Sequence, residues 1–104
     1  MSQIQITCAG SATFDVLAKA AGPLPIGVLG LVDTFSTAEG GPALRTGRVL
    51  AGMGIETRLI FPVGVDISGR SFRETVPAPH LHVEFVDSDQ PTSTSLVAVD
   101  GDGE

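Results

Sequence analysis

The chain has 104 residues, 42% of them hydrophobic, and a formal net charge of −6 at pH 7. Its length fits one domain, and the hydrophobic fraction predicts a packed core instead of disorder. The six basic residues are scattered and form no basic stripe, so we expect no nucleic-acid partner. With 5% aromatic residues and no Trp or Tyr, the core must be aliphatic, which favours an α/β layer structure.

The single cysteine and the short apolar segments indicate the cellular compartment in which we expect the protein. Cys8 alone excludes an internal disulfide and a cysteine-based zinc site, and its apolar neighbours predict a buried side chain. The apolar segment 22–32 contains Pro23 and Pro25 and is too short to cross a bilayer, and no charged leader precedes it. We therefore expect a cytoplasmic protein with no membrane partner.

The first half of the chain predicts three strands. Residues 4–9 form a short β-branched run, and residues 14–20 continue as a second strand. The connector 21–27 holds two prolines and two glycines, which leave little room for regular structure. Over 31–37, apolar and polar residues alternate, and this period of two predicts a third, half-exposed strand.

The second half alternates helices with strands. Small and apolar residues recur at helical spacing from Ala43 to Met53, followed by a glycine stop. Further elements follow: a strand at 57–63, a helix capped by Ser68 and ending near Val76, strands at 81–86 and 93–99, and a hairpin turn at 100–104. Helices between strands predict a parallel core sheet, and the short paired strands predict a smaller layer beside it.

The most informative motif is the pair Gly40-Gly41, directly before the first predicted helix. Without a Cβ, such a pair lets backbone approach a ligand, and the helix presents its unpaired N–H groups there. Taken alone, a plain loop before a helix explains the pair better. Asp15, taken alone, is likewise better explained as a residue of a strand end or turn.

Four segments together resemble the ribokinase-like (PfkB) carbohydrate kinases. Residues 10–15, Gly-Ser-Ala-Thr-Phe-Asp, are similar to the family's Gly-x-x-x-x-Asp start, and residues 40–54 to its first signature. Residues 63–72 resemble its Val-Gly-x-Asp-x-x-Gly-x-x-Phe segment, and residues 91–104 its Thr-rich strand with a Gly-Glu turn. The chain is thus identified as the N-terminal part, residues 1–104, of a PfkB-type kinase domain, cut before the catalytic region.

The resemblance implies a ribokinase-like α/β fold: a partial parallel sheet with helices, and small β-strands near 13–19, 31–37 and 93–100 that form a lid. It implies an ATP-dependent enzyme, working with Mg²⁺, that phosphorylates a hydroxyl of a small-molecule sugar. The sugar-binding residues that it implies are Asp15, Thr13, Gly40 and Gly41. A carboxylate such as that of Asp15 accepts hydrogen bonds from sugar hydroxyls well.

The chain departs from the family at Arg45, where Asn is usual, and at Pro42. Asn both donates and accepts hydrogen bonds, whereas Arg only donates and carries a charge. If Arg45 faces the pocket, it joins the substrate-binding residues and favours an anionic sugar, such as a sugar acid or sugar phosphate. If it faces solvent, sugar binding by this chain is in doubt.

The family's Gly-Ala-Gly-Asp segment, with its base aspartate, and its ATP-binding loops have no counterpart before Glu104. We therefore expect no catalytic residue here, no ATP or Mg²⁺ bound by this chain itself, and an isolated chain without kinase activity. The alternative is a non-catalytic binding or interaction module derived from the lid. Its open strand edges would then pair with a second copy in a homodimer.

The remaining polar residues receive structural interpretations. Asp66 is interpreted as a turn and helix-start residue and not as a ligand. His80 and His82 have a spacing that can bind a metal on one face of a strand. No third ligand is evident, however, and the neighbouring prolines favour a loop with solvated histidines.

Overall fold

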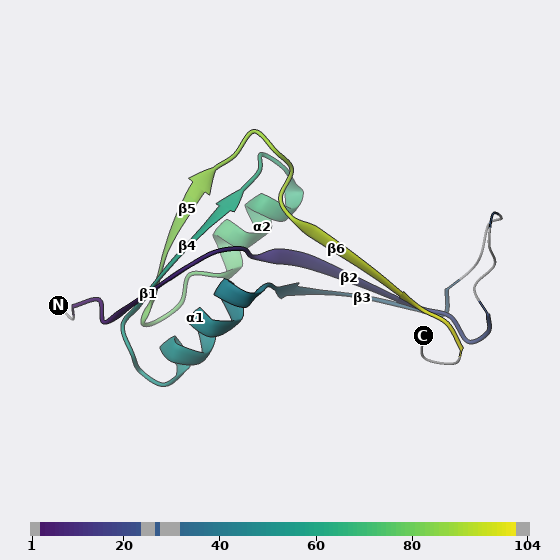
Figure 1. The fold of residues 1–104 in the computed structure, drawn as a ribbon, viewed down its shortest axis with the longest axis horizontal. Coiled ribbons are helices and arrows are strands. Elements are labelled where there is room, and N and C mark those ends of the chain that lie inside the picture. Colours follow the sequence, from purple (N-terminus) through teal and green to yellow (C-terminus); the bar gives the residue numbers. More distant parts are fainter. Residues whose placement is uncertain (1–2, 24–26, 28–31, 102–104) are drawn as a thin grey trace.

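The computed structural model describes residues 3–23, 27 and 32–101. Its elements are β1 (Ile6–Ala9), β2 (Thr13–Lys19), β3 (Thr34–Gly40), α1 (Pro42–Gly52), β4 (Thr57–Val63), α2 (Ile67–Thr75), β5 (Leu81–Asp87) and β6 (Thr94–Val99). They form two three-stranded sheets, ordered β1-β4-β5 and β3-β2-β6 (Figure 1). The order of strands and helices is the predicted one. Parts of the expected connector 21–27, the start of the strand expected at 31–37 and most of the turn expected at 100–104 lie outside the described residues.

The first sheet is parallel and carries the core. Its central strand β4 buries Leu59, Phe61 and Val63 on one face, because alternate side chains of a strand point the same way. On that face Phe61 meets Phe72 of α2 edge-on, with ring centroids 5.7 Å apart. Leu44 of α1 is also fully buried in this cluster. The expectation of an aliphatic core was wrong, since most of the few aromatic residues lie in this core or pack against it. The predicted α/β fold with a parallel sheet and helices is therefore confirmed.

The second sheet, hereafter the projecting sheet (β3, β2 and β6), extends away from the core (Figure 1). It gives the described chain its elongated extents of 55 × 31 × 19 Å. The central strand β2 pairs antiparallel with β3 and parallel with β6. Phe14 of β2 reaches the core, where its ring lies 6.5 Å from that of Phe72. The projecting sheet is thus anchored at one end by an aromatic contact.

Most elements begin and end within two residues of the predicted bounds, but one strand and one helix cap differ more clearly. The third strand lies at Thr34–Gly40, three residues later than expected, because its register pairs Gly40 with Thr13 at the start of β2. Ser68 does not cap α2. Asp66 does so, since its extended backbone lets its carboxylate accept a hydrogen bond from the Gly69 amide at 2.7 Å.

The burial expected for Cys8 is also only partly met. Cys8 lies in β1, which pairs with β4 on one side only and is therefore an edge strand. Its side chain packs against the core yet remains half-buried. The apolar run around it predicted a strand correctly, but burial depends on the position of that strand in the sheet.

Candidate functional site

The predicted site residues meet where the projecting sheet joins the core. β1 runs into β2 through Gly10–Ala12, and β3 runs into α1 through Gly41. The register of β2 and β3 places Thr13 opposite Gly40, and Asp15 two residues further along β2. Residues 27 positions apart in sequence therefore share one junction, and Thr13, Asp15, Gly40 and Gly41 lie together there.

Asp15 is the polar centre of this junction. Its Oδ1 accepts a hydrogen bond from the Thr13 hydroxyl at 2.6 Å. A Cβ on Gly40 would lie 2.3 Å from Oδ2, so the missing side chain is what leaves room for the carboxylate. The Asp15 side chain is 28% exposed, and its Oδ2 receives no hydrogen bond from the residues that the structure describes. This oxygen is available to a ligand.

Gly41 is required for a different reason. Its φ is 100°, a conformation that L side chains rarely adopt. A Cβ there would lie 2.7 Å from the Ser11 carbonyl oxygen and 2.8 Å from the Ala12 Cα, both backbone atoms. Both glycines thus make room for the protein's own chain, and their contact with a sugar stays a prediction.

Arg45 lies in the first turn of α1, where its amide donates to the Gly41 carbonyl at 3.0 Å. Its guanidinium Nη2 is 3.8 Å from Oδ2 of Asp15, while its side chain stays 73% exposed. The guanidinium thus lies near Asp15 although most of the side chain is exposed, and whether Arg45 faces a sugar pocket stays a prediction. Arg48, one turn further on, is instead held by Glu39 of β3 at 2.7 Å.

A second polar cluster, missed by sequence reasoning, ties the start of β6 to the start of α2. The hydroxyl of Thr92, which is buried, donates to Asp66 Oδ1 at 2.6 Å and accepts from the Gly64 amide at 2.9 Å. The Thr92 amide donates to Asp66 Oδ2 at 2.8 Å. These bonds from Thr92, and that from Gly69, lower the pKa of Asp66 against a smaller opposing effect of burial. The helix-start role of Asp66 is confirmed, and it has a second partner.

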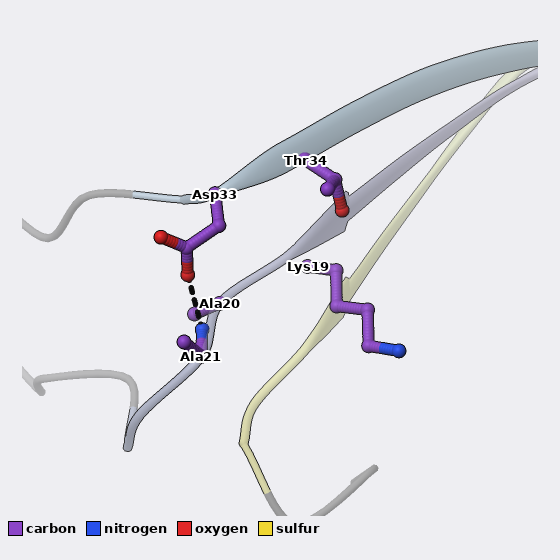
Figure 2. A pocket seen from close by; sticks show the side chains of 5 residues that line it. All are labelled: Lys19, Ala20, Ala21, Asp33 and Thr34. Atoms are coloured by element: carbon purple, nitrogen blue, oxygen red, sulfur yellow. Dashed lines mark hydrogen bonds between the residues drawn. The ribbon is translucent and has the colours of Figure 1, made fainter.

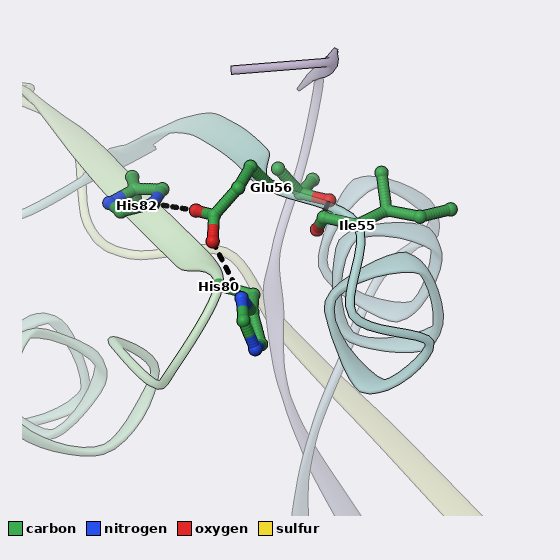
Figure 3. A network of polar contacts seen from close by, with 5 residues as sticks. Ile55, Glu56, His80 and His82 are labelled. Carbon is green, nitrogen blue, oxygen red and sulfur yellow. Dashed lines mark hydrogen bonds and ion pairs between the residues drawn. The ribbon is translucent and has the colours of Figure 1, made fainter. Parts of the chain in front are cut away.

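His80 and His82 converge on Glu56 (Figure 3). His80 Nδ1 lies 2.6 Å from Oε1 of Glu56, and His82 Nε2 bonds the other carboxylate oxygen. Both hydrogen bonds lower the pKa of Glu56, and the bond with His80 has the larger effect. The histidines are exposed as expected, but the expectation that they are merely solvated was wrong. Within the described part of the chain, no three His, Cys, Asp or Glu side chains are arranged to hold a metal ion.

A hollow of about 210 Å³ lies at the far end of the projecting sheet (Figure 2). It is lined by Lys19, Ala20, Ala21, Asp33 and Thr34, and the Asp33 carboxylate accepts a hydrogen bond from the Ala21 amide there. Lys19 ends β2, whereas Thr13 begins it. The hollow is thus separated from Asp15 by most of the length of the strand and is not part of the candidate site.

Comparison with known proteins identifies the family. The pfkB family carbohydrate kinases match residues 3–104, and the chain belongs to this family. No protein among the curated sequences matches the chain. The chain is similar in structure to a microbiome-derived acarbose kinase, with a TM-score of 0.81 and 20% identity over 99% of this chain and 35% of that one.

Two ribokinases are also similar. That of Thermotoga maritima gives a TM-score of 0.76 and 18% identity, over 98% of this chain and 34% of that one. That of Arabidopsis thaliana, complexed with ribose and ATP, gives a TM-score of 0.77 and 19% identity, over 95% of this chain and 33% of that one. The chain therefore spans about a third of the length of the kinases that it matches. None of the helices described in the structure is long and apolar enough to cross a membrane.

Proposed function

We propose that the protein to which this chain belongs is an ATP-dependent sugar kinase, and that these 104 residues supply sugar contacts and part of a lid. Membership of the family supports the class of reaction. The observation that carries the assignment of the site is Asp15. Its carboxylate is held by Thr13 in the space that Gly40 leaves, and no residue that the structure describes donates a hydrogen bond to its second oxygen. A pre-positioned acceptor of this kind can orient a sugar hydroxyl.

In this reaction an oxygen of the sugar attacks the γ-phosphorus of ATP, the bond to the ADP oxygen breaks, and the hydroxyl proton passes to a base. Mg²⁺ would neutralise charge on the phosphates. We assign neither ATP, Mg²⁺ nor the base to any of these 104 residues, and expect the 104 residues alone to be inactive. Their task is to bind and orient the sugar, while the projecting sheet acts as a lid that excludes water. We further propose a cytoplasmic location.

The test uses the full-length protein, with ADP production measured over a panel of neutral and acidic sugars. Asp15→Asn keeps the shape of the side chain and the acceptor for Thr13, but removes the charge. We expect its kcat/KM to fall about ten- to a hundredfold, the range for a lost hydrogen bond to a charged group. Asp89→Asn is the matched control, because Asp89 is exposed in the turn after β5 and its carboxylate, among the residues placed by the structure, bonds only the neighbouring Gln90.

An Asp15→Asn variant as active as the unchanged protein would remove Asp15 from the site. An unchanged protein that phosphorylates no sugar of the panel would count against the kinase itself. Equal losses in Asp15→Asn and Asp89→Asn would point to a general charge effect and not to a sugar contact.

A second candidate, a homodimer through the lid strands, is favoured by one face of the projecting sheet. Phe35 is 65% exposed and Leu96 73% exposed. They are register partners of Ala18 and Val16 on β2, so all four lie on the face opposite Asp15. A second copy would cover this apolar face. Sedimentation of the unchanged protein and of Phe35→Ser tests this, since a dimer should dissociate in the variant.

A further inference from the structure

The arginines of α1 differ in how they are engaged. The guanidinium of Arg48 forms a 2.7 Å hydrogen-bonded ion pair with Glu39, so its charge is neutralised locally. Arg45 reaches Asp15 only at 3.8 Å and makes no hydrogen bond through its side chain to any residue that the structure describes. Its N–H donors are therefore free to bind a ligand, next to a carboxylate oxygen that is equally free.

The ion pair with Asp15 does not account for this placement. At 3.8 Å and 73% exposure, an ion pair contributes little to stability, because water screens the charges. The placement also runs against the helix dipole, since a cation in the first turn is disfavoured and no acidic residue lies there. An anion bound at Arg45 would offset this cost.

We infer that the site accepts a sugar bearing an anionic group, a carboxylate or a phosphate, with Arg45 binding the anion and Asp15 a neighbouring hydroxyl. This rests on the proposed sugar-kinase function. The two side chains are complementary to such a ligand, since Arg offers donors in a planar fork that matches carboxylate and phosphate, while Asp offers only acceptors. A neutral sugar would offer no negative charge to the guanidinium of Arg45.

The test measures binding to the full-length protein by calorimetry, with two matched pairs of sugars. Glucose is compared with gluconate, and fructose with fructose 6-phosphate, so that each pair differs in one anionic group. We expect one anionic member to bind about tenfold or more tightly than its neutral partner, as for a charge-assisted hydrogen bond. The pair that shows this difference distinguishes a carboxylate from a phosphate.

Arg45→Gln should abolish the preference and leave the affinity for the neutral sugar within about twofold. Arg58→Gln is the control, because it also removes one cation from an exposed ion pair, with Glu84 at 2.7 Å on β5, away from the junction. A measurement that needs no variant is salt dependence. Raising the ionic strength from about 0.05 to 0.5 M should weaken binding of the anionic sugar more than of the neutral one.

Neutral sugars that bind as tightly as their anionic partners would overturn the inference and leave the kinase proposal standing. The same holds if Arg45→Gln weakens both members of a pair equally. If neither member of either pair binds to the unchanged protein, the inference and the proposed function both fail.

Discussion

Replacing Gly41 by Ala is the sharpest test of the junction. Two costs are combined at this residue: a φ of 100°, and backbone atoms of Ser11 and Ala12 within 2.8 Å of the new Cβ. With ψ at 148°, this backbone conformation is one that glycine adopts readily and an L residue adopts only at a cost of about 1–3 kcal/mol. The overlap adds about 1–3 kcal/mol, because backbone atoms cannot rotate away as a side-chain end can. We expect Gly41→Ala to lower the free energy of unfolding by about 2–6 kcal/mol.

Two other glycines separate these costs. Gly54, shortly after α1, has a φ of 82° and nothing within 4 Å of an added Cβ, so Gly54→Ala should cost only the conformational part, about 1–2 kcal/mol. Gly52, the last residue of α1, has neither restriction. Gly52→Ala should therefore stabilise the protein slightly, by at most about 0.5 kcal/mol, because Ala has the higher helix propensity but the helix ends at this position.

The three variants are compared by urea unfolding, followed by circular dichroism in the full-length protein. The expected order of stability is Gly52→Ala, then Gly54→Ala, then Gly41→Ala. The reasoning is refuted if Gly41→Ala is no less stable than Gly54→Ala, because the close packing against Ser11 and Ala12 would then carry no energy.

Two further predictions concern the core sheet. The lowered pKa of Glu56 means that its contacts with His80 stabilise the fold above about pH 4.5, its ordinary value, and that this contribution is lost as the pH falls through the lowered pKa. The difference in urea midpoint between the unchanged protein and Glu56→Gln should hence shrink below pH 4.5, and a constant difference would contradict this. Phe72→Ala should cost about 3–5 kcal/mol, since the ring is fully buried against Phe61. Val65→Ala is the control, because Val65 is 98% exposed, and it should change the urea midpoint very little.

Local sequence patterns predicted most of the elements. The strand at 57–63 has the expected bounds, and α1 begins and ends one residue before the expected helix. Both carry strong periodicity and lie against the core, so the pattern and the packing agree. β3 was misplaced because its side chains are mostly exposed, which leaves its position to be fixed by pairing with β2.

The site was predicted as a set of residues but not as a geometry. The sequence motifs brought Thr13, Asp15, Gly40 and Gly41 together through a family resemblance, and the structure places them at one junction. The direction of Arg45 could not be read from the sequence, because it depends on how α1 meets β2. The hydrogen bonds between Thr92 and Asp66 were not predicted either, because they join residues 26 positions apart that only the folding of the chain brings together.

The connections of the projecting sheet have a consequence for protein engineering. Its strands come from two separate stretches, residues 13–40 and 94–99, and between them the chain builds α1, β4, α2 and β5 of the core. A chimaera that exchanges this sheet with that of a relative must therefore splice both stretches at once. Grafting the β2–β3 hairpin alone would leave a foreign β2 beside the original β6, with six register pairs to satisfy between unmatched sequences.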